Sequence, residues 1–197
     1  MQTIEYFMIP SSPWTYLGHA RLGEIAAANN AKIELKPFDL GQVFPVSGGL
    51  PLGKRAPQRQ VYRLAELARW RDFLQLPLTV EPKFFPTPAD AAMQLIVAAN
   101  QLSGDAAAFA LAGAIMKALW AEETDIADAQ SLRAIATAQG LDYDQLIKAA
   151  PAAVETIAAN TREAIDTQVF GSPWFRINGQ NFWGQDRLDF VERALRI

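Results

Sequence analysis

Ser12 is the first residue of the chain whose position suggests chemistry, because it stands between an apolar stretch and a helical pattern. The surrounding segment reads YFMIPSSPWTYLG from Tyr6 to Gly18. The pattern places Ser12 at a helix N-cap and Pro13 at the first helical position, where a missing N–H costs nothing. The first turn of a helix carries free N–H groups and a partial positive charge, which suit a thiolate. We therefore interpret Ser12 either as a plain cap or as part of an anion-stabilising site.

The residue types that are absent limit what this serine can do. The 197 residues include no cysteine and a single histidine, His19. The lack of cysteine excludes a disulfide scaffold, a zinc site with thiolate ligands and a redox thiol of the protein's own. One histidine excludes a metal site built from several histidines and argues against a Ser-His-Asp arrangement. His19 is expected at the surface or in packing. Because the chain has no cysteine, any thiol at Ser12 has to come from a ligand.

Composition and charge are those of an ordinary globular chain. Half of the residues are apolar, a fifth are charged and the formal net charge is −3, so neither nucleic acid nor a membrane surface is an expected partner. The longest apolar stretch, residues 106–120, is too short to span a bilayer and contains Lys117. The first residues, MQTIEYFM, lack the basic and apolar regions of a signal peptide. The expected location is the cytoplasm.

The hydrophobic pattern predicts an α/β frame that is interrupted by helices. Residues 3–9 and 32–38 read as strands on either side of the helix that begins at Ser12, and a β-α-β connection makes these strands parallel. The glycine- and proline-rich residues 39–57 are expected to form a long functional or mobile loop. Within the last helical stretch, Pro151 is expected to start a new helix. The expected helices cover residues 58–75, 88–102, 105–123, 128–139 and 143–167.

The C-terminal part returns to strands. WFRI and NFW flank an Asn-Gly turn and predict a hairpin, and an amphipathic helix follows from about Gln185. This order of elements resembles the layout of the thioredoxin fold, and the resemblance implies a proline, usually cis, before the third strand. Pro173 in FGSPWF takes that position.

Four segments carry a resemblance to a known family: SSPWTYLG, LPLGKRAPQRQVYRLAELARW, AIMKALWAEETDIAD and VFGSPWFRINGQNFWGQDRL. Spread over nearly the whole chain, they resemble the 2-hydroxychromene-2-carboxylate isomerase family, whose relatives are kappa-class glutathione transferases and DsbA-like oxidoreductases. FWGQDR is the most telling, since dithiol oxidoreductases have no need of it. The expected fold class is α/β, a thioredoxin-like fold with an inserted all-helical domain of the DsbA-like or kappa-class type. Its thioredoxin-like domain would comprise residues 1–45 and 150–197, and the helical domain residues 46–149.

The resemblance implies glutathione as cofactor and no metal. Ser12 would be the catalytic residue, donating its hydroxyl hydrogen to the glutathione sulfur, while the backbone at Ser172 and Pro173 would pair with the cysteinyl part. Gln185 and Asp186 would bind the γ-glutamyl end, with Asp186 taking its ammonium group. Many relatives carry valine and threonine around this proline, where this chain has serine and tryptophan. The candidates for substrate contact are Trp14, Phe44, Lys54, Arg55 and Trp174.

A basic stripe precedes and opens the helix expected at residues 58–75. Lys54 and Arg55 lie in the preceding loop, and Arg59 and Arg63 share one helical face at i,i+4 spacing. Such a stripe is most often a solvated face. Its alternative is contact with the carboxylates of glutathione or substrate, for which the two loop residues are the better candidates.

The activity that the resemblance implies is a glutathione-dependent cis–trans isomerisation. It converts 2-hydroxychromene-2-carboxylate to trans-o-hydroxybenzylidenepyruvate, or acts on a related intermediate of aromatic catabolism, through reversible addition of the thiolate to a conjugated carbon. The implied partners are a small aromatic carboxylate and a second copy of the chain in a homodimer. Two alternatives stay open: a kappa-class-like glutathione transferase, which releases the adduct, and a non-catalytic DsbA-like binding module.

Overall fold

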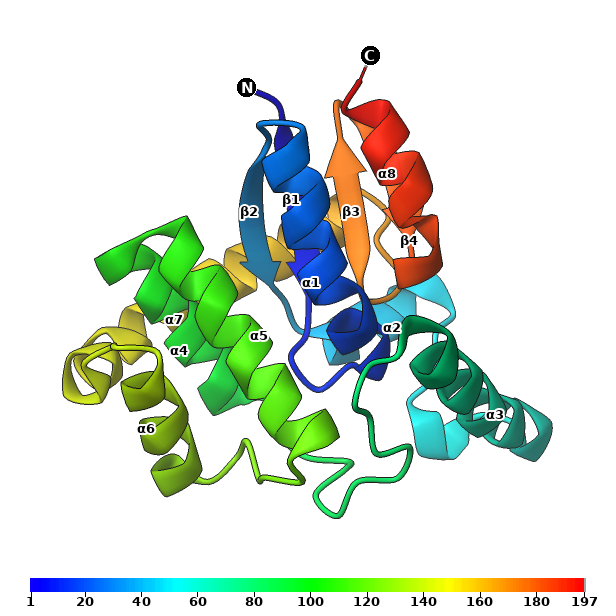
Figure 1. Ribbon diagram of the computed structural model, residues 1–197, viewed down its shortest axis with the longest axis horizontal. Coiled ribbons are helices and arrows are strands. Elements are labelled where there is room, and N and C mark those ends of the chain that lie inside the picture. The colour runs from blue at the N-terminus through cyan, green and yellow to red at the C-terminus, as the bar shows by residue number, and fades with distance from the viewer. Residues whose placement is uncertain (197) are drawn as a thin grey trace.

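A four-stranded mixed sheet forms the frame of the computed structural model, which describes residues 1–196 (Figure 1). β2 is parallel to β1, as the β-α-β pattern predicts, whereas β3 and β4 run antiparallel to their neighbours. Asn178 and Gly179, with φ of 49° and 78°, make the tight turn of the predicted hairpin. In the sheet order β2-β1-β3-β4, the bounds are β1 (Thr3–Met8), β2 (Lys32–Pro37), β3 (Trp174–Ile177) and β4 (Gln180–Trp183).

Helices cover both faces of this sheet. α1 (Pro13–Ala28) and α8 (Leu188–Ala194) lie over one face, and α7 (Tyr143–Asp166) passes behind the other (Figure 1). Within residues 1–196, no helix has the length and apolar character needed to cross a membrane. The expected thioredoxin-like α/β fold is confirmed, with helices inserted between β2 and β3. The other helical elements are α2 (Leu40–Ser47), η1 (Leu52–Lys54), α3 (Pro57–Leu74), α4 (Asp90–Ser103), α5 (Asp105–Ala121), α6 (Ala129–Ala138) and η2 (Gln185–Arg187).

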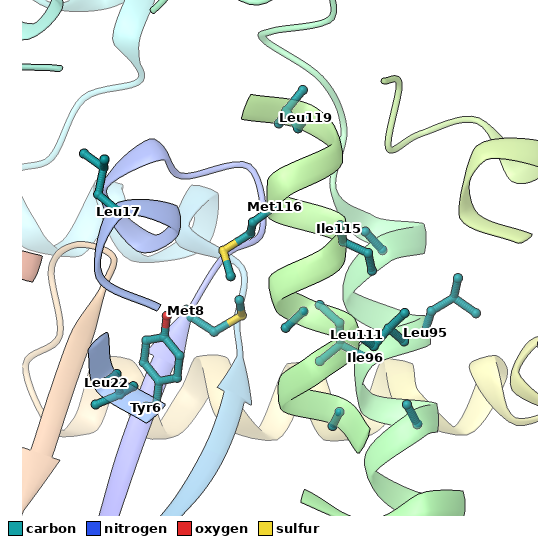
Figure 2. Packing of buried hydrophobic residues seen from close by; sticks show 14 of the residues in the cluster. Tyr6, Met8, Leu17, Leu22, Leu95, Ile96, Leu111, Ile115, Met116 and Leu119 are labelled. Carbon is teal, nitrogen blue, oxygen red and sulfur yellow. The ribbon is translucent and has the colours of Figure 1, made fainter. Parts of the chain in front are cut away.

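Strand alternation divides the core between the two faces of the sheet. Tyr6 and Met8 of β1 belong to a large cluster that continues to Met116 of α5, and Figure 2 shows these side chains together with those of α1 and α4. Phe7 points the other way and packs with Ala164 of α7 in a second cluster. Burial of one large apolar side chain contributes about 2 kcal/mol to the stability of the folded state. The sheet and the inserted helices α4 and α5 therefore share one core.

The expectation of a loop throughout residues 39–57 is wrong, because α2 occupies much of this segment. Asp39 caps α2 by accepting a hydrogen bond from the backbone N–H of Gly41 at 2.8 Å. Gly48 ends the helix in the left-handed region, at φ 74°. Gly48 thus marks the end of a short helix that has Pro45 in its interior, and this helix contributes to the wall of a cavity.

The expectation that Pro151 starts a new helix is also wrong. α7 is continuous, and Pro151 lies in its interior. The N-terminus is capped instead by Asp142, whose carboxylate accepts hydrogen bonds from the backbone N–H groups of Asp144 and Gln145 at 3.0 and 3.2 Å. α7 packs against α4, and Ala150 and Ala153 on either side of the proline are buried, so tertiary packing favours the continuous helix.

Candidate functional site

A cavity of about 720 Å³ opens where the N-terminus of α1 meets α2, α3, η2 and the turn before β3. Its volume lies within the range of small-molecule binding sites. The wall brings together residues from distant parts of the chain, including Ser12, Arg55, Ser172 and Asp186. The fold thus gathers into one site the two motifs that the sequence places at opposite ends of the chain.

Ser12 lines this cavity as the N-cap of α1, which confirms the predicted cap. Its Oγ accepts a hydrogen bond from the backbone N–H of Thr15 at 3.3 Å and donates one to the backbone O of Ser172 at 3.2 Å. Both distances are long for a hydroxyl group, so these bonds are weak and readily exchanged. Neither partner is a base, and Ser12 is therefore suited to stabilise an anion rather than to act as a nucleophile.

The turn before β3 is tied to the end of β1 by a second hydroxyl network. Pro173 follows a cis peptide bond, as predicted, and Ser172 rather than Pro173 lines the cavity. Ser172 Oγ accepts a hydrogen bond from the backbone N–H of Ile9 at 3.0 Å and shares another with the hydroxyl of Thr15 at 2.9 Å. Both hydroxyl side chains are buried, so this network fixes the position of the Ser172 backbone relative to Ser12.

Replacement of Thr15 by valine is expected to lower the free energy of unfolding by about 1–2 kcal/mol, because the buried Ser172 hydroxyl loses one partner. Denaturant unfolding of T15V, S172A and the double variant tests this as a cycle. We expect the double variant to be clearly more stable than additivity of the two single effects requires. Additive losses would show that the 2.9 Å contact between the two hydroxyls carries no energy.

The η2 turn brings its side chains to the cavity through close contact with α1. A Cβ at Gly18 would lie only 2.8 Å from Cβ of Gln185, so the contact requires glycine at this position. Gly184, at φ 98°, begins η2 in the left-handed region. Asp186 lines the cavity and pairs with Arg187 at 2.9 Å. Because both partners are partly exposed, this pair is weak and leaves the Asp186 carboxylate open to a cationic group.

The residues predicted for substrate contact divide into two groups. Trp14, Phe44 and Arg55 line the cavity. Lys54 is exposed, Trp174 is buried, and neither lies on the cavity wall. Strand alternation explains the position of Trp174, since it belongs to the cluster on the α7 side of the sheet.

Two exposed aromatic side chains on the wall were not among the predicted site residues. The rings of Phe170 and Trp183 have centroids 4.8 Å apart, and Trp183 is 53% exposed although it belongs to a strand. An outward-facing tryptophan at the end of a short hairpin strand, directly before Gly184, is the sequence signal that points to it. These two rings extend the apolar wall beside Asp186.

The cavity combines an anion-stabilising helix end with a positively charged wall. Arg55, Arg59 and Arg63 face it from α3 and the residues just before α3, whereas the acidic Glu66 and Asp186 are each paired with an arginine. In residues 1–196, no group of three or more histidine, cysteine, aspartate or glutamate side chains is placed to hold a metal ion. The arrangement suits reversible addition of an anionic nucleophile that a ligand supplies.

Known proteins resemble the chain over almost its full length. The family described as DSBA-like thioredoxin domain matches residues 3–196. The protein of Sphingobium xenophagum named 2-hydroxychromene-2-carboxylate isomerase is 29% identical over 197 residues, which cover 98% of each chain. Human glutathione S-transferase kappa 1 is 25% identical over 207 residues, which cover 98% of this chain and 91% of the human one. A solved structure of 2-hydroxychromene-2-carboxylate isomerase matches with a TM-score of 0.79 at 25% identity, covering 98% of this chain and 94% of that chain.

Proposed function

The chain belongs to the DsbA-like thioredoxin-domain family, and from this premise we propose that it is a glutathione-dependent cis–trans isomerase. The proposed substrate is a small conjugated aromatic carboxylate such as 2-hydroxychromene-2-carboxylate, the compound in the names of its bacterial relatives. The observation that carries the proposal is Ser12 at the N-terminus of α1, lining a cavity in a chain that has no cysteine.

Residues on the cavity wall fit glutathione in charge and in hydrogen-bonding capacity. The N-terminus of α1 and the Ser12 hydroxyl suit a thiolate. The backbone O of Ser172, which accepts the long bond from Ser12, suits the cysteinyl N–H, and Asp186 suits the ammonium group. Gln185 would support the same γ-glutamyl end from η2. The name of the human kappa-class relative supports glutathione as the ligand.

When bound, glutathione supplies a thiolate that adds reversibly to a conjugated carbon, so that the former double bond can rotate. The chain's contribution is to keep the sulfur ionised. Ser12 turns its hydroxyl hydrogen from the Ser172 carbonyl toward the sulfur, and the free N–H groups of α1 add their partial positive charge. Trp14 and Phe44 supply a flat apolar surface for the ring of the substrate.

A glutathione transferase is the second candidate, because human glutathione S-transferase kappa 1 is similar over 98% of this chain. In that case the adduct leaves the enzyme as the product. Chromatography of the reaction mixture separates the two activities. A rearranged substrate with unchanged glutathione identifies an isomerase, whereas a stable conjugate that accumulates with turnover identifies a transferase.

Calorimetric titration with glutathione tests the proposal directly. We expect saturable binding, weaker binding of S-methylglutathione, and about tenfold weaker binding of glutathione to D186N, which lacks the carboxylate for the ammonium group. The matched control is D189N, since Asp189 is exposed, pairs with Arg21 and does not line the cavity. Absence of binding at millimolar glutathione would remove both the cofactor and the enzyme proposal and would favour a DsbA-like binding module.

A further inference from the structure

Three arginines on one wall of the cavity carry positive charge that no carboxylate in residues 1–196 neutralises through a direct ion pair. Arg55 precedes α3, and Arg59 and Arg63 follow it at intervals of one helical turn. Nε of Arg55 donates a hydrogen bond to the backbone O of Leu50 at 2.8 Å, and the guanidinium of Arg63 lies over the ring of Phe85 at 5.1 Å. Backbone and ring contacts thus hold two of these guanidinium groups in place.

The acidic groups nearby do not cancel this charge. Glu66 is on the same wall, but its carboxylate pairs with Arg69. Asp186 pairs with the arginine that follows it in η2. Glu81 favours the charged form of Arg63 without forming an ion pair with it. An excess of positive charge therefore remains on the α3 side of the cavity.

Burial and neighbouring like charge both disfavour the charged forms of Arg55 and Arg63. Burial and the charge of Arg55 lower the pKa of Arg63 to about 10, although Glu81 acts in the opposite direction. Burial and the charge of Arg59 also lower the pKa of Arg55. Like charges in a partly buried wall repel one another, and an anion placed among them converts this repulsion into attraction. The planar guanidinium matches a carboxylate particularly well.

We propose that Arg55, Arg59 and Arg63 form a second subsite of the cavity, which binds a carboxylate of the ligand whose reacting centre lies at Ser12. The identity of that reacting centre rests on the proposed function, whereas anion binding at the subsite does not require turnover. Tyr62 of α3 and Phe85 also line the cavity, and the Phe85 ring lies under the guanidinium of Arg63, so a carboxylate attached to a flat conjugated body fits this wall. Two sources share this chemistry, the second substrate and the glycine end of glutathione.

Calorimetry with trans-cinnamate, a flat conjugated carboxylate, tests the subsite in the absence of glutathione. We expect cinnamate to bind the wild-type chain, to bind R59Q and R63Q about tenfold more weakly, and to lose affinity as ionic strength rises. Its uncharged amide, cinnamamide, should bind all three proteins equally. The matched control is R71Q, because Arg71 lies on the same helix, pairs with Asp72 and, like Asp72, does not line the cavity.

Glutathione and γ-glutamylcysteine, which lacks the glycine, identify the source of the carboxylate. Weaker binding of glutathione but not of γ-glutamylcysteine to R63Q assigns the subsite to the glycine end, whereas loss of cinnamate binding alone assigns it to the second substrate. R63K, which keeps the charge, should retain part of the affinity. The proposal is overturned if R59Q and R63Q bind both carboxylate ligands as tightly as R71Q does, or if the wild-type chain binds neither. Cinnamate binding without glutathione binding would overturn the proposed function and leave the subsite standing.

Discussion

Replacement of Ser12 by alanine is expected to lower turnover about 100-fold or more, which is the usual cost of losing one hydrogen bond to a developing or stabilised anion. The hydroxyl lies at the N-terminus of α1, where its hydrogen can leave the long bond to the Ser172 carbonyl and reach a sulfur anion. The same change removes a helix cap, which costs about 1 kcal/mol of stability. S12A should therefore lose most of its turnover while it remains folded.

The pKa of bound glutathione separates the chemical role of Ser12 from its role as a cap. Thiolate absorbance in the ultraviolet, followed against pH, should show a lowered pKa in the wild-type complex and a higher pKa in S12A. D128A is the matched control, since Asp128 caps α6 by accepting a hydrogen bond from the backbone N–H of Ser131 at 2.8 Å, away from the cavity. Equal turnover and equal thiol pKa in S12A and wild type would rule out the thiolate role of Ser12.

Acidification from pH 6.5 to about 4 is expected to destabilise the protein by about 3 kcal/mol through His19 alone. His19 is buried, and burial lowers its pKa from 6.5 to about 4, although its hydrogen bond to the backbone O of Phe109 acts in the opposite direction. Because the folded-state pKa is the lower one, the unfolded chain binds more protons in this interval, and stability rises with pH across it. Above pH 6.5, the neutral His19 makes its full contribution to the free energy of unfolding.

The contacts of His19 show how the neutral imidazole fits into the core. Its Nε2 lies 3.0 Å from the carbonyl of Phe109, which can only accept, so Nε2 carries the hydrogen. Nδ1 lies 3.4 Å from the hydroxyl of Tyr6, and the imidazole stacks on the ring of Phe109 with centroids 3.8 Å apart. This residue joins the sheet, α1 and α5, so its protonation acts on the shared core.

Denaturant unfolding at several pH values measures this effect, and the NMR signal of the single imidazole reports its pKa. H19Q should be less stable at neutral pH, since it loses the stacked ring, but should show a flatter pH dependence between 6.5 and 4. Carboxylates with lowered pKa, such as Asp105 and Asp144, lose their contribution mainly below their usual 3.8 and are unchanged in H19Q. Identical pH dependence in wild type and H19Q would contradict the assignment.

Much of the frame was predictable from local pattern. Ser12 and Pro13 cap a helix, and Asn178-Gly179 close a hairpin, because capping and turn formation depend on residues only a few positions apart. Alternation and helical periodicity likewise place most strands and helices. The failures at α2 and at Pro151 have one cause, since packing against the rest of the fold outweighed glycine and proline signals in these segments.

The sequence by itself determined that the chain has no thiol of its own, that a serine caps the first helix, and that a proline precedes the third strand. Only the tertiary structure decided that Ser12 meets the carbonyl of Ser172, that Trp174 faces away from the cavity, and that Arg59 and Arg63 line its wall. The physical reason is the distance along the chain between the residues that interact. Caps, turns and alternation arise from neighbours in the chain, whereas a cavity wall is set by how distant elements pack around one shared core.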